Sequence, residues 1–414
     1  MHKKRNIVLL LLFLAWTLSY MDRMVMTVAI PYIAEDFSLS TVEMGWVMSA
    51  FFAGYALFQI PGGLLADKFG ARKTMVTAIS WWSIFTGITA MVSNLTSMLV
   101  VRVLFGIGEA SFPGGSWKTL SNWFPKKERA TANGIMMSSN ALGPAIAPLF
   151  VVSVMAIFGW RSVFAFLVIP GLILAAIMWF VIRDNPADSK MVSPEELKVI
   201  QEGSEDTSPD KKLSFKDVIK QSMVWKLVLI WFTFDITFWG FSSWIPTYLV
   251  QARGFDMVNM GINASIPFFA GTVGLILGGY ISDKYFVGRR RILIIGSDII
   301  SAILLYLTFS TSAAVPAMVF LSLSGFFICL SFGAIWALPM NVLKPEVMGS
   351  SSAFINFGGQ AAGFLSPIVI GYLIQQAGGS FNTAFYFLIA AVLVSAALTL
   401  TVREHEKVSV SVSQ

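Results

Sequence analysis

Hydrophobic residues in this chain form long, nearly uninterrupted blocks separated by short polar stretches, without the alternation of a water-soluble strand or amphipathic helix. A helix needs about twenty apolar residues to cross a bilayer core of roughly 30 Å. Lipid offers the backbone no hydrogen bonds, so helices are the element that fits these blocks. The pattern predicts an all-α integral membrane protein with twelve spans, at about 7–32, 44–64, 74–94, 97–121, 130–154, 161–182, 224–250, 258–281, 292–312, 315–341, 349–374 and 381–402.

The longest polar stretch falls between the sixth and seventh spans and divides the chain into two halves of six helices. Capping signals at Ser193–Glu196 and at Ser214–Asp217 predict two short interfacial helices in this linker. The predicted domains are an N-terminal half, a cytoplasmic linker, a C-terminal half and a cytoplasmic tail: 1–183, 184–223, 224–403 and 404–414.

Two sequence matches at one offset indicate that the halves repeat each other. Gly63-Leu-Leu-Ala-Asp-Lys at the end of the second span matches Gly279-Tyr-Ile-Ser-Asp-Lys at the end of the eighth, and Asn140 in the fifth span matches Asn356 in the eleventh. Internal repeats of this kind build transporters whose substrate site lies near the bilayer midplane. We therefore expect a cavity between the two halves.

Basic residues predict the orientation of the chain. The net charge is +6, and most Lys and Arg residues fall on alternate connections. Cytoplasmic loops retain such residues, so both termini are predicted to be cytoplasmic in the cell (inner) membrane, and the positive charge is not read as a nucleic-acid site. The basic N-terminus followed by an apolar stretch resembles a signal peptide, but the stretch is long and lacks a small-residue cleavage site, so it is expected to remain as the first span.

Charged residues inside spans are the strongest candidates for function, since each costs roughly 2.5–3.5 kcal/mol to insert. The first span contains Asp22 and Arg23, and the fourth contains Arg102 and Glu109. Seven residues separate Arg102 from Glu109, which puts them on one helix face about 10 Å apart. Asp235 and Asp298 are weaker candidates, and Asp298 is expected to be a helix-packing or cytoplasmic-cavity residue.

These residue types suit the binding of an organic anion coupled to protons. A guanidinium matches a carboxylate geometrically, so Arg23 is the predicted substrate clamp. Asp22 and Glu109 are the predicted proton carriers, with Arg102 tuning one of them. When ionised, Asp22 would compete with the substrate for Arg23. The alternative is that these charges only hold the helices together.

Neutral residues of the cavity would recognise hydroxyl groups if the substrate is a sugar acid. Amides offer donors and an acceptor, while the alternative role is hydrogen bonding between helices. The predicted substrate-binding residues are Tyr20, Tyr55, Asn140, Asn356, Gln360 and Trp336, with Trp244 and Tyr248 as further candidates.

The segment from Gly63 to Lys73, GLLADKFGARK, resembles the loop 2–3 signature of the major facilitator superfamily. The resemblance implies the major facilitator fold and a gating role for these residues rather than substrate binding. Asp67 is expected to accept hydrogen bonds from amides at a helix N-terminus. The predicted gating residues are Gly63, Asp67, Lys68, Gly70, Arg72 and the second-half Asp283.

Further motifs resemble the anion:cation symporter family within this superfamily: Tyr20-Met-Asp-Arg23, Gly108-Glu-Ala-Ser-Phe-Pro113, and Gly159-Trp-Arg161. That family includes bacterial carriers of hexuronates, galactonate and glucarate. The resemblance implies proton-coupled uptake of a small organic anion by alternating access. A facilitator, an exchanger, an exporter of another organic anion and a transporter-like sensor are the alternatives.

Several other functions are not expected. A single cysteine, Cys329, allows no disulfide within the chain and no cysteine metal site, and both histidines lie in terminal tails. There is no phosphate-binding loop, and the soluble segments are too short for an enzyme site. We expect no cofactor, no metal and no nucleic-acid partner, and a protein that functions as a monomer in the lipid bilayer.

Overall fold

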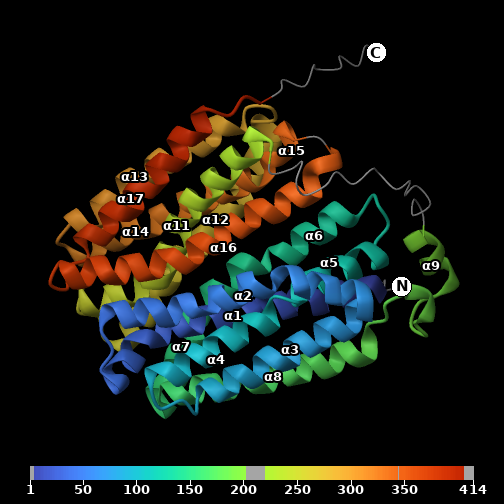
Figure 1. The fold of residues 1–414 in the computed structure, drawn as a ribbon, viewed down its shortest axis with the longest axis horizontal. Coiled ribbons are helices and arrows are strands. Elements are labelled where there is room, and N and C mark those ends of the chain that lie inside the picture. The colour runs from blue at the N-terminus through green and yellow to red at the C-terminus, as the bar shows by residue number, and fades with distance from the viewer. Residues whose placement is uncertain (1–3, 202–219, 344, 405–414) are drawn as a thin grey trace. The chain divides into compact units, whose positions relative to one another are not determined.

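The structure, a computed structural model, describes residues 4–201, 220–343 and 345–404, which form helices joined by short turns (Figure 1). The helices are α1 Lys4–Phe37, α2 Thr41–Phe69, α3 Ala71–Thr89, α4 Leu95–Glu109, α5 Phe112–Trp123, α6 Arg129–Met137, α7 Ser139–Phe158, α8 Trp160–Val181, η1 Pro186–Asp188, α9 Pro194–Gln201, α11 Ser222–Gln251, α12 Met257–Tyr285, α13 Arg290–Ser310, α14 Ala314–Ala337, α15 Pro339–Val342, α16 Pro345–Gln376 and α17 Asn382–Leu400.

Every predicted span coincides with a helix or with two consecutive helices. The fourth, fifth and tenth spans are interrupted, as α4–α5, α6–α7 and α14–α15. In the linker, Ser193 caps α9 as predicted, because its hydroxyl accepts a hydrogen bond from the Glu196 amide (3.2 Å). The second predicted linker helix, near Ser214, lies outside the described residues.

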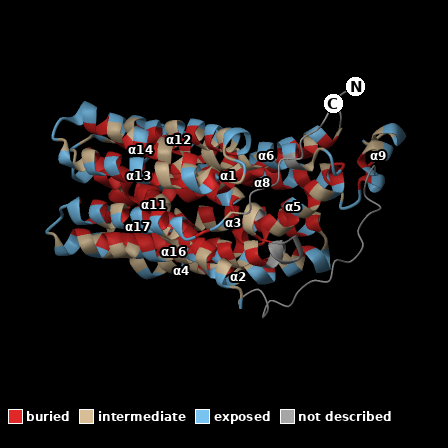
Figure 2. Cartoon of the chain, turned by 90° about the horizontal axis from the view of Figure 1, so that it is seen from above, coloured by how far each residue is buried: buried red, intermediate tan, exposed pale blue. Residues whose placement is uncertain are grey.

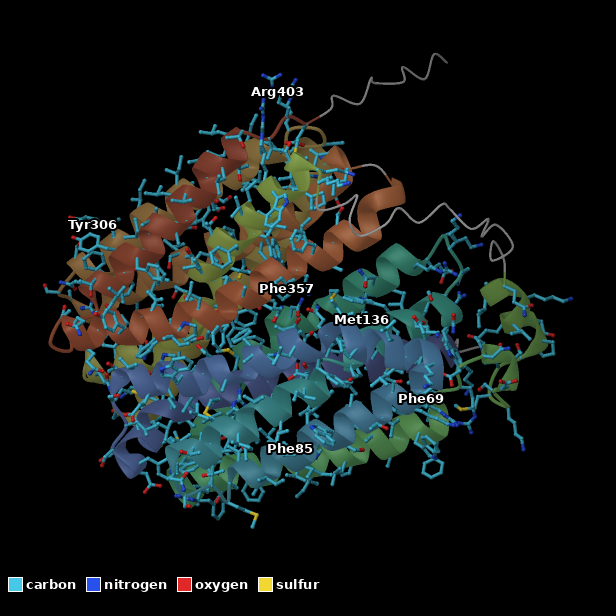
Figure 3. The ribbon with its side chains drawn as sticks, viewed as in Figure 1. Phe69, Phe85, Met136, Tyr306, Phe357 and Arg403 are labelled. Atoms are coloured by element: carbon cyan, nitrogen blue, oxygen red, sulfur yellow. The ribbon has the colours of Figure 1, made fainter. Side chains whose placement is uncertain are left out.

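Eleven stretches among the described residues are long and apolar enough to cross a membrane. The predicted third span forms α3 but is not one of them, because α3 contains Arg72 and Lys73 in its first turn and is rich in threonine, serine and tryptophan. Large apolar side chains on the spans face outward, including Phe180 (73% exposed) and Tyr306 (49% exposed; Figure 3). Buried and exposed residues occur along the same helices (Figure 2), and so much exposed apolar surface fits lipid rather than water.

The helices form two compact units. Among the described residues, the first contains 4–201, 242–265 and 363–380, and the second contains 220–241, 266–343, 345–362 and 381–404. Parts of α11, α12 and α16 thus belong to each unit. The predicted six-helix domains follow the chain order instead and remain a prediction.

In the first unit, α2 and α4 approach each other at backbone distance. A Cβ added to Gly54 would collide with the Val103 carbonyl, and one added to Gly106 would collide with the Phe51 carbonyl. Small residues allow such close packing in membrane helices. The contact brings the aromatic residues of α2 alongside the charged face of α4.

Prolines interrupt two spans next to candidate site residues. Pro113 lacks an amide hydrogen and its ring would clash with the carbonyl of Glu109, four residues earlier, which explains why α4 ends at Glu109. Pro144 stands in the same relation to Asn140, close to the α6–α7 interruption. Both side chains therefore lie where the regular helical hydrogen bonding is broken.

In the second unit, α11 packs against α16 and α17. Ile236, Ala362 and Ala391 form a buried cluster, and the Thr237 hydroxyl donates to the Leu388 carbonyl (2.9 Å). Glycines at repeat-related positions make the corresponding contacts in both units: Gly143 of α7 lies against Tyr20 of α1, and Gly359 of α16 lies against Asp235 of α11. The packing therefore follows the repeat that the sequence indicates.

The turn between α2 and α3 contains a glycine that no other residue replaces without strain. Gly70 has φ 90° and ψ 154°, a region accessible essentially to glycine alone. At the N-terminus of α3, the Arg72 amide donates a hydrogen bond to the carboxylate of Asp184 (2.8 Å). Our expectation of Asp67 in that role was wrong: Asp67 is instead paired with Lys118 (3.0 Å).

The second unit has the same arrangement at the start of α13. Glu404, which follows the last helix, accepts hydrogen bonds from the amides of Arg290 (3.1 Å) and Arg291 (2.7 Å). Asp184 likewise follows the last span of the first half. Asp283, the counterpart of Asp67, is paired with the guanidinium of Arg290 (2.6 Å).

Gly70→Ala is predicted to lower the apparent melting temperature, because it forces a side chain into a region that costs about 1–3 kcal/mol and places a Cβ against Asp184. Gly63→Ala is the matched control, since its added Cβ would meet nothing within 4 Å. The check is thermal unfolding of the purified variants in detergent. Equal melting temperatures for the two variants would contradict the role of Gly70.

Candidate functional site

A buried ion pair joins α1 to α4 in the first unit. Arg23 Nε donates to Glu109 Oε1 (2.7 Å), and a terminal guanidinium nitrogen reaches the same oxygen. The Ser19 hydroxyl donates to it as well (2.5 Å). Arg23 is 8% exposed and Glu109 1% exposed, so water screens this pair little.

Aromatic rings surround the rest of the Arg23 guanidinium. Its central carbon lies 5.0 Å from the ring centre of Tyr20, 4.7 Å from that of Phe51 and 4.9 Å from that of Tyr55. The electron-rich faces of such rings attract a cation. They hold the guanidinium in place while leaving its hydrogen-bond donors for an anion.

Asp22 points to a different environment from its neighbour Arg23. It is 3% exposed, and the charged groups that act on it are Arg102 and Glu109. The Trp82 indole of α3 lies beside its carboxylate without a hydrogen bond of ordinary geometry. Adjacent residues on a helix project about 100° apart, which explains the separation.

Arg102 completes the cluster on α4. It is 3% exposed and lies over the ring of Phe105 (4.8 Å) and near that of Phe51 (5.7 Å). It makes no ion pair within 4 Å among the residues that the structure describes. Two acids and two arginines thus share one buried region, where opposite charges can offset part of the cost of burying each other.

The structure corrects one feature of the expected mechanism. The acid that occupies Arg23 is Glu109, whereas Asp22 was expected to compete for it. The second carboxylate oxygen of Glu109 has no hydrogen-bond partner. Sequence reasoning also missed Ser19, Phe51 and Trp82, which complete the surroundings of the charges. Their types are common in membrane helices, so only their contacts distinguish them.

The neutral candidates in the first unit lie next to Arg23. Tyr20 stacks on Trp16 (5.6 Å between ring centres), and Asn140 interacts with the Tyr20 side chain. The carbonyl oxygen of the Asn140 amide has no hydrogen-bond partner. Tyr55 is buried against Arg23. Tyr248 has a different partner, because its hydroxyl accepts a hydrogen bond from Arg253 (2.6 Å).

The other candidates belong to the second unit. Gln360 is buried and its side-chain oxygen has no partner, while Asn356 is partly buried on the same helix, α16. Trp336 stacks on Trp231 (4.7 Å). Asp298 accepts a hydrogen bond from Ser331 (2.6 Å), which fits the packing role expected for it.

The described residues include no group of three or more His, Cys, Asp or Glu side chains that could hold a metal ion. A site built from an aromatic-lined arginine and buried acids has the groups needed to hold an anion and to exchange protons.

The chain belongs to the Major Facilitator Superfamily, whose family model matches residues 12–367. It is therefore a multi-pass membrane transporter and not an enzyme. The fold agrees: the crystal structure of a bacterial homologue of the human lysosomal transporter Spinster, in an inward-facing and occupied conformation, superposes with a TM-score of 0.77 at 21% identity, covering 97% of each chain.

Several relatives of this chain are named as transporters of sugar acids and related anions. The chain is 31% identical to the hexuronate transporter of Bacillus subtilis (91% of this chain, 90% of that protein). It is 32% identical to a probable sulfoacetate transporter of Cupriavidus necator (91% and 89%). It is 30% identical to the D-galactonate transporter of Escherichia coli O6:H1 (95% and 94%).

Neutralising one partner of the Arg23–Glu109 pair is predicted to destabilise the protein by about 3–5 kcal/mol, because it leaves a buried charge without compensation. The double variant Arg23→Gln/Glu109→Gln should lose less than the sum of the two single variants, since no charge is left unpaired. Thermal unfolding in detergent, run as a double-mutant cycle, measures this difference. Additive losses would show that the two residues do not interact.

Proposed function

We propose that the protein takes up a small organic anion by proton symport, and that the anion is a sugar acid. The observation that carries this proposal is the buried Arg23–Glu109 pair inside its aromatic surroundings. An arginine suited to a carboxylate is here occupied by a carboxylic acid that can take up a proton. The relatives that carry hexuronate and D-galactonate support the same substrate class.

In the proposed cycle, Glu109 and the substrate compete for Arg23. Ionised Glu109 holds the guanidinium, and protonated Glu109 releases it to a substrate carboxylate. Proton and anion then favour each other's binding, and by linkage the effect is reciprocal. Asp22 is the second proposed proton carrier, with Arg102 as the charge that tunes it.

The remaining proposed roles follow from the repeat and the charge pattern. The two six-helix halves are the proposed moving parts of alternating access, and the basic connections support a cytoplasmic location for both termini. Tyr20, Tyr55 and Asn140 are proposed to contact the substrate near Arg23, and Asn356, Gln360 and Trp336 to contact its hydroxyl groups.

A small sulfonate is the second candidate substrate. The relative that carries sulfoacetate in its name motivates it, and a guanidinium binds a sulfonate as well as a carboxylate. Competition between the two substrate classes for uptake distinguishes them.

Purified protein in liposomes is predicted to accumulate one sugar acid when the inside is alkaline relative to the outside. Accumulation should cease with a protonophore and with Asp22→Asn. Glu109→Gln should also bind substrate with an affinity that no longer changes with pH, because the competing charge is gone. Uptake of labelled substrate and equilibrium binding, each measured from about pH 5 to about pH 8, test these effects.

Asp298→Asn is the matched control, since it neutralises a buried acid of the second unit that is hydrogen-bonded to Ser331. It should keep the proton dependence of uptake. Equilibration of the acid without any gradient dependence would make the protein a facilitator. Failure to take up any sugar acid, with uptake of sulfoacetate, would favour the second substrate class.

Asp67→Ala is predicted to reduce the turnover number severalfold and to leave KM near that of the unaltered protein. Asp67 is paired with Lys118 at the end of α2, far along the helix from Tyr55 and the charged cluster. The control is Asp188→Ala, an exposed acid in η1. Initial rates of uptake across substrate concentrations separate the two constants. A raised KM with unchanged turnover would place Asp67 in substrate binding instead.

A further inference from the structure

Asp235 is a buried carboxylate whose charge nothing in the described chain compensates. It lies on α11 in the second unit and is 3% exposed. Its Oδ1 atom has no hydrogen-bond partner, and no described Lys or Arg forms an ion pair with it. Buried polar groups almost always have hydrogen-bond partners. An intramembrane acid without a partner in the protein therefore indicates that a bound ligand supplies the partner.

One turn earlier on the same helix, Trp231 presents the complementary group. Residues four apart lie on one helix face, and the Trp231 indole is also 3% exposed. Its N–H has no acceptor among the residues that the structure describes. The ring stacks on Trp336 with 4.7 Å between centres and 16° between planes. Stacking fixes the plane of the indole and leaves its N–H donor unused.

Gly359 of α16 shows that the Asp235 carboxyl group and the Trp231 indole N–H lie together. A Cβ added there would collide with both Asp235 Oδ2 and Trp231 Nε1. These two atoms therefore lie over the same backbone position, where only a glycine leaves room for both side chains. The adjacent Gln360 is 7% exposed, and its side-chain oxygen also lacks a partner.

A hydroxyl group satisfies this arrangement. It donates to one acceptor and accepts from one donor, and the indole N–H offers a donor while the Asp235 carboxylate offers an acceptor. A metal ion would require more ligands, and the described residues form no such group. An anionic ligand group would be repelled by the carboxylate. A hydroxyl group on an uncharged part of a substrate needs no further ligands and is not repelled by the carboxylate.

We propose that Asp235 and Trp231 form a hydroxyl-binding site that selects polyhydroxylated acids among the transported anions. This inference rests on the proposed function, because it names the part of a sugar acid that the second unit recognises. Asp235 accepts a hydrogen bond from one substrate hydroxyl, and Trp231 donates a hydrogen bond to that hydroxyl. Gly359 lets the Asp235 and Trp231 side chains lie side by side against α16.

The experiment compares Trp231→Phe and Asp235→Asn with the unaltered protein in reconstituted uptake. Trp231→Phe keeps an aromatic ring for stacking and removes the N–H. The probes are the transported sugar acid and its series of monodeoxy analogues, each lacking one hydroxyl. Trp225→Phe on the same helix, 47% exposed, is the control for the substitution itself.

We expect both variants to raise KM for the sugar acid by about tenfold, as expected when a buried hydrogen-bond partner is removed, with little change in turnover number. For one deoxy analogue the same substitutions should change KM less than about twofold, because the hydrogen bonds are already missing. Trp225→Phe should match the unaltered protein for every probe.

Four results would overturn the proposal. Equal loss for the sugar acid and all deoxy analogues would mean that the site holds only a structural water or supports packing. A changed proton requirement in Asp235→Asn, with unchanged selectivity among the analogues, would make Asp235 a proton carrier instead. Failure of the unaltered protein to take up any hydroxylated acid would overturn the proposed function and this inference together, whereas normal uptake with unaffected variants would overturn this inference alone.

Discussion

The cost of placing charge in an apolar medium governs the organisation of the first unit. Arg23 of α1 and Glu109 of α4 are both buried, and their opposite charges compensate each other at hydrogen-bond distance. Ser19 donates a further hydrogen bond to Glu109. Without the partner, either charge would carry the full desolvation penalty. Asp22 and Arg102 bring the cluster to neutrality. In the proposed cycle, a proton on Glu109 would leave Arg23 free for an external anion.

Helix geometry delivers these side chains to one place through glycine and proline. Gly54 and Gly106 let α2 and α4 meet at backbone distance, so the rings of Phe51 and Tyr55 reach the arginine of α1. Pro113 ends α4 directly after the site glutamate. Small residues and helix breaks of this kind are tolerated in membranes when neighbouring helices satisfy the freed backbone groups.

The two units share a helix-capping interaction, but the residues that make it do not occupy equivalent positions in the two sequence repeats. A carboxylate from the segment after the last helix of each half accepts hydrogen bonds from the N-terminus of the third: Asp184 in the first unit and Glu404 in the second. Negative charge at a helix N-terminus is favourable because the amides there have no helical partners. The helix N-terminus is therefore capped by a carboxylate in both units, although the positions of the capping residues differ.

The sequence by itself determined the helical segments, the repeat and the residues that carry charge into the membrane. Those features are local: the length of an apolar block fixes a span, and an isolated charge is visible wherever it occurs. Only the tertiary structure decided that Arg23 pairs with Glu109 rather than Asp22, that Asp184 rather than Asp67 caps α3, and that Asp235 and Trp231 meet at Gly359. Pairings depend on how distant helices rotate and approach, and backbone contacts between helices set that rotation.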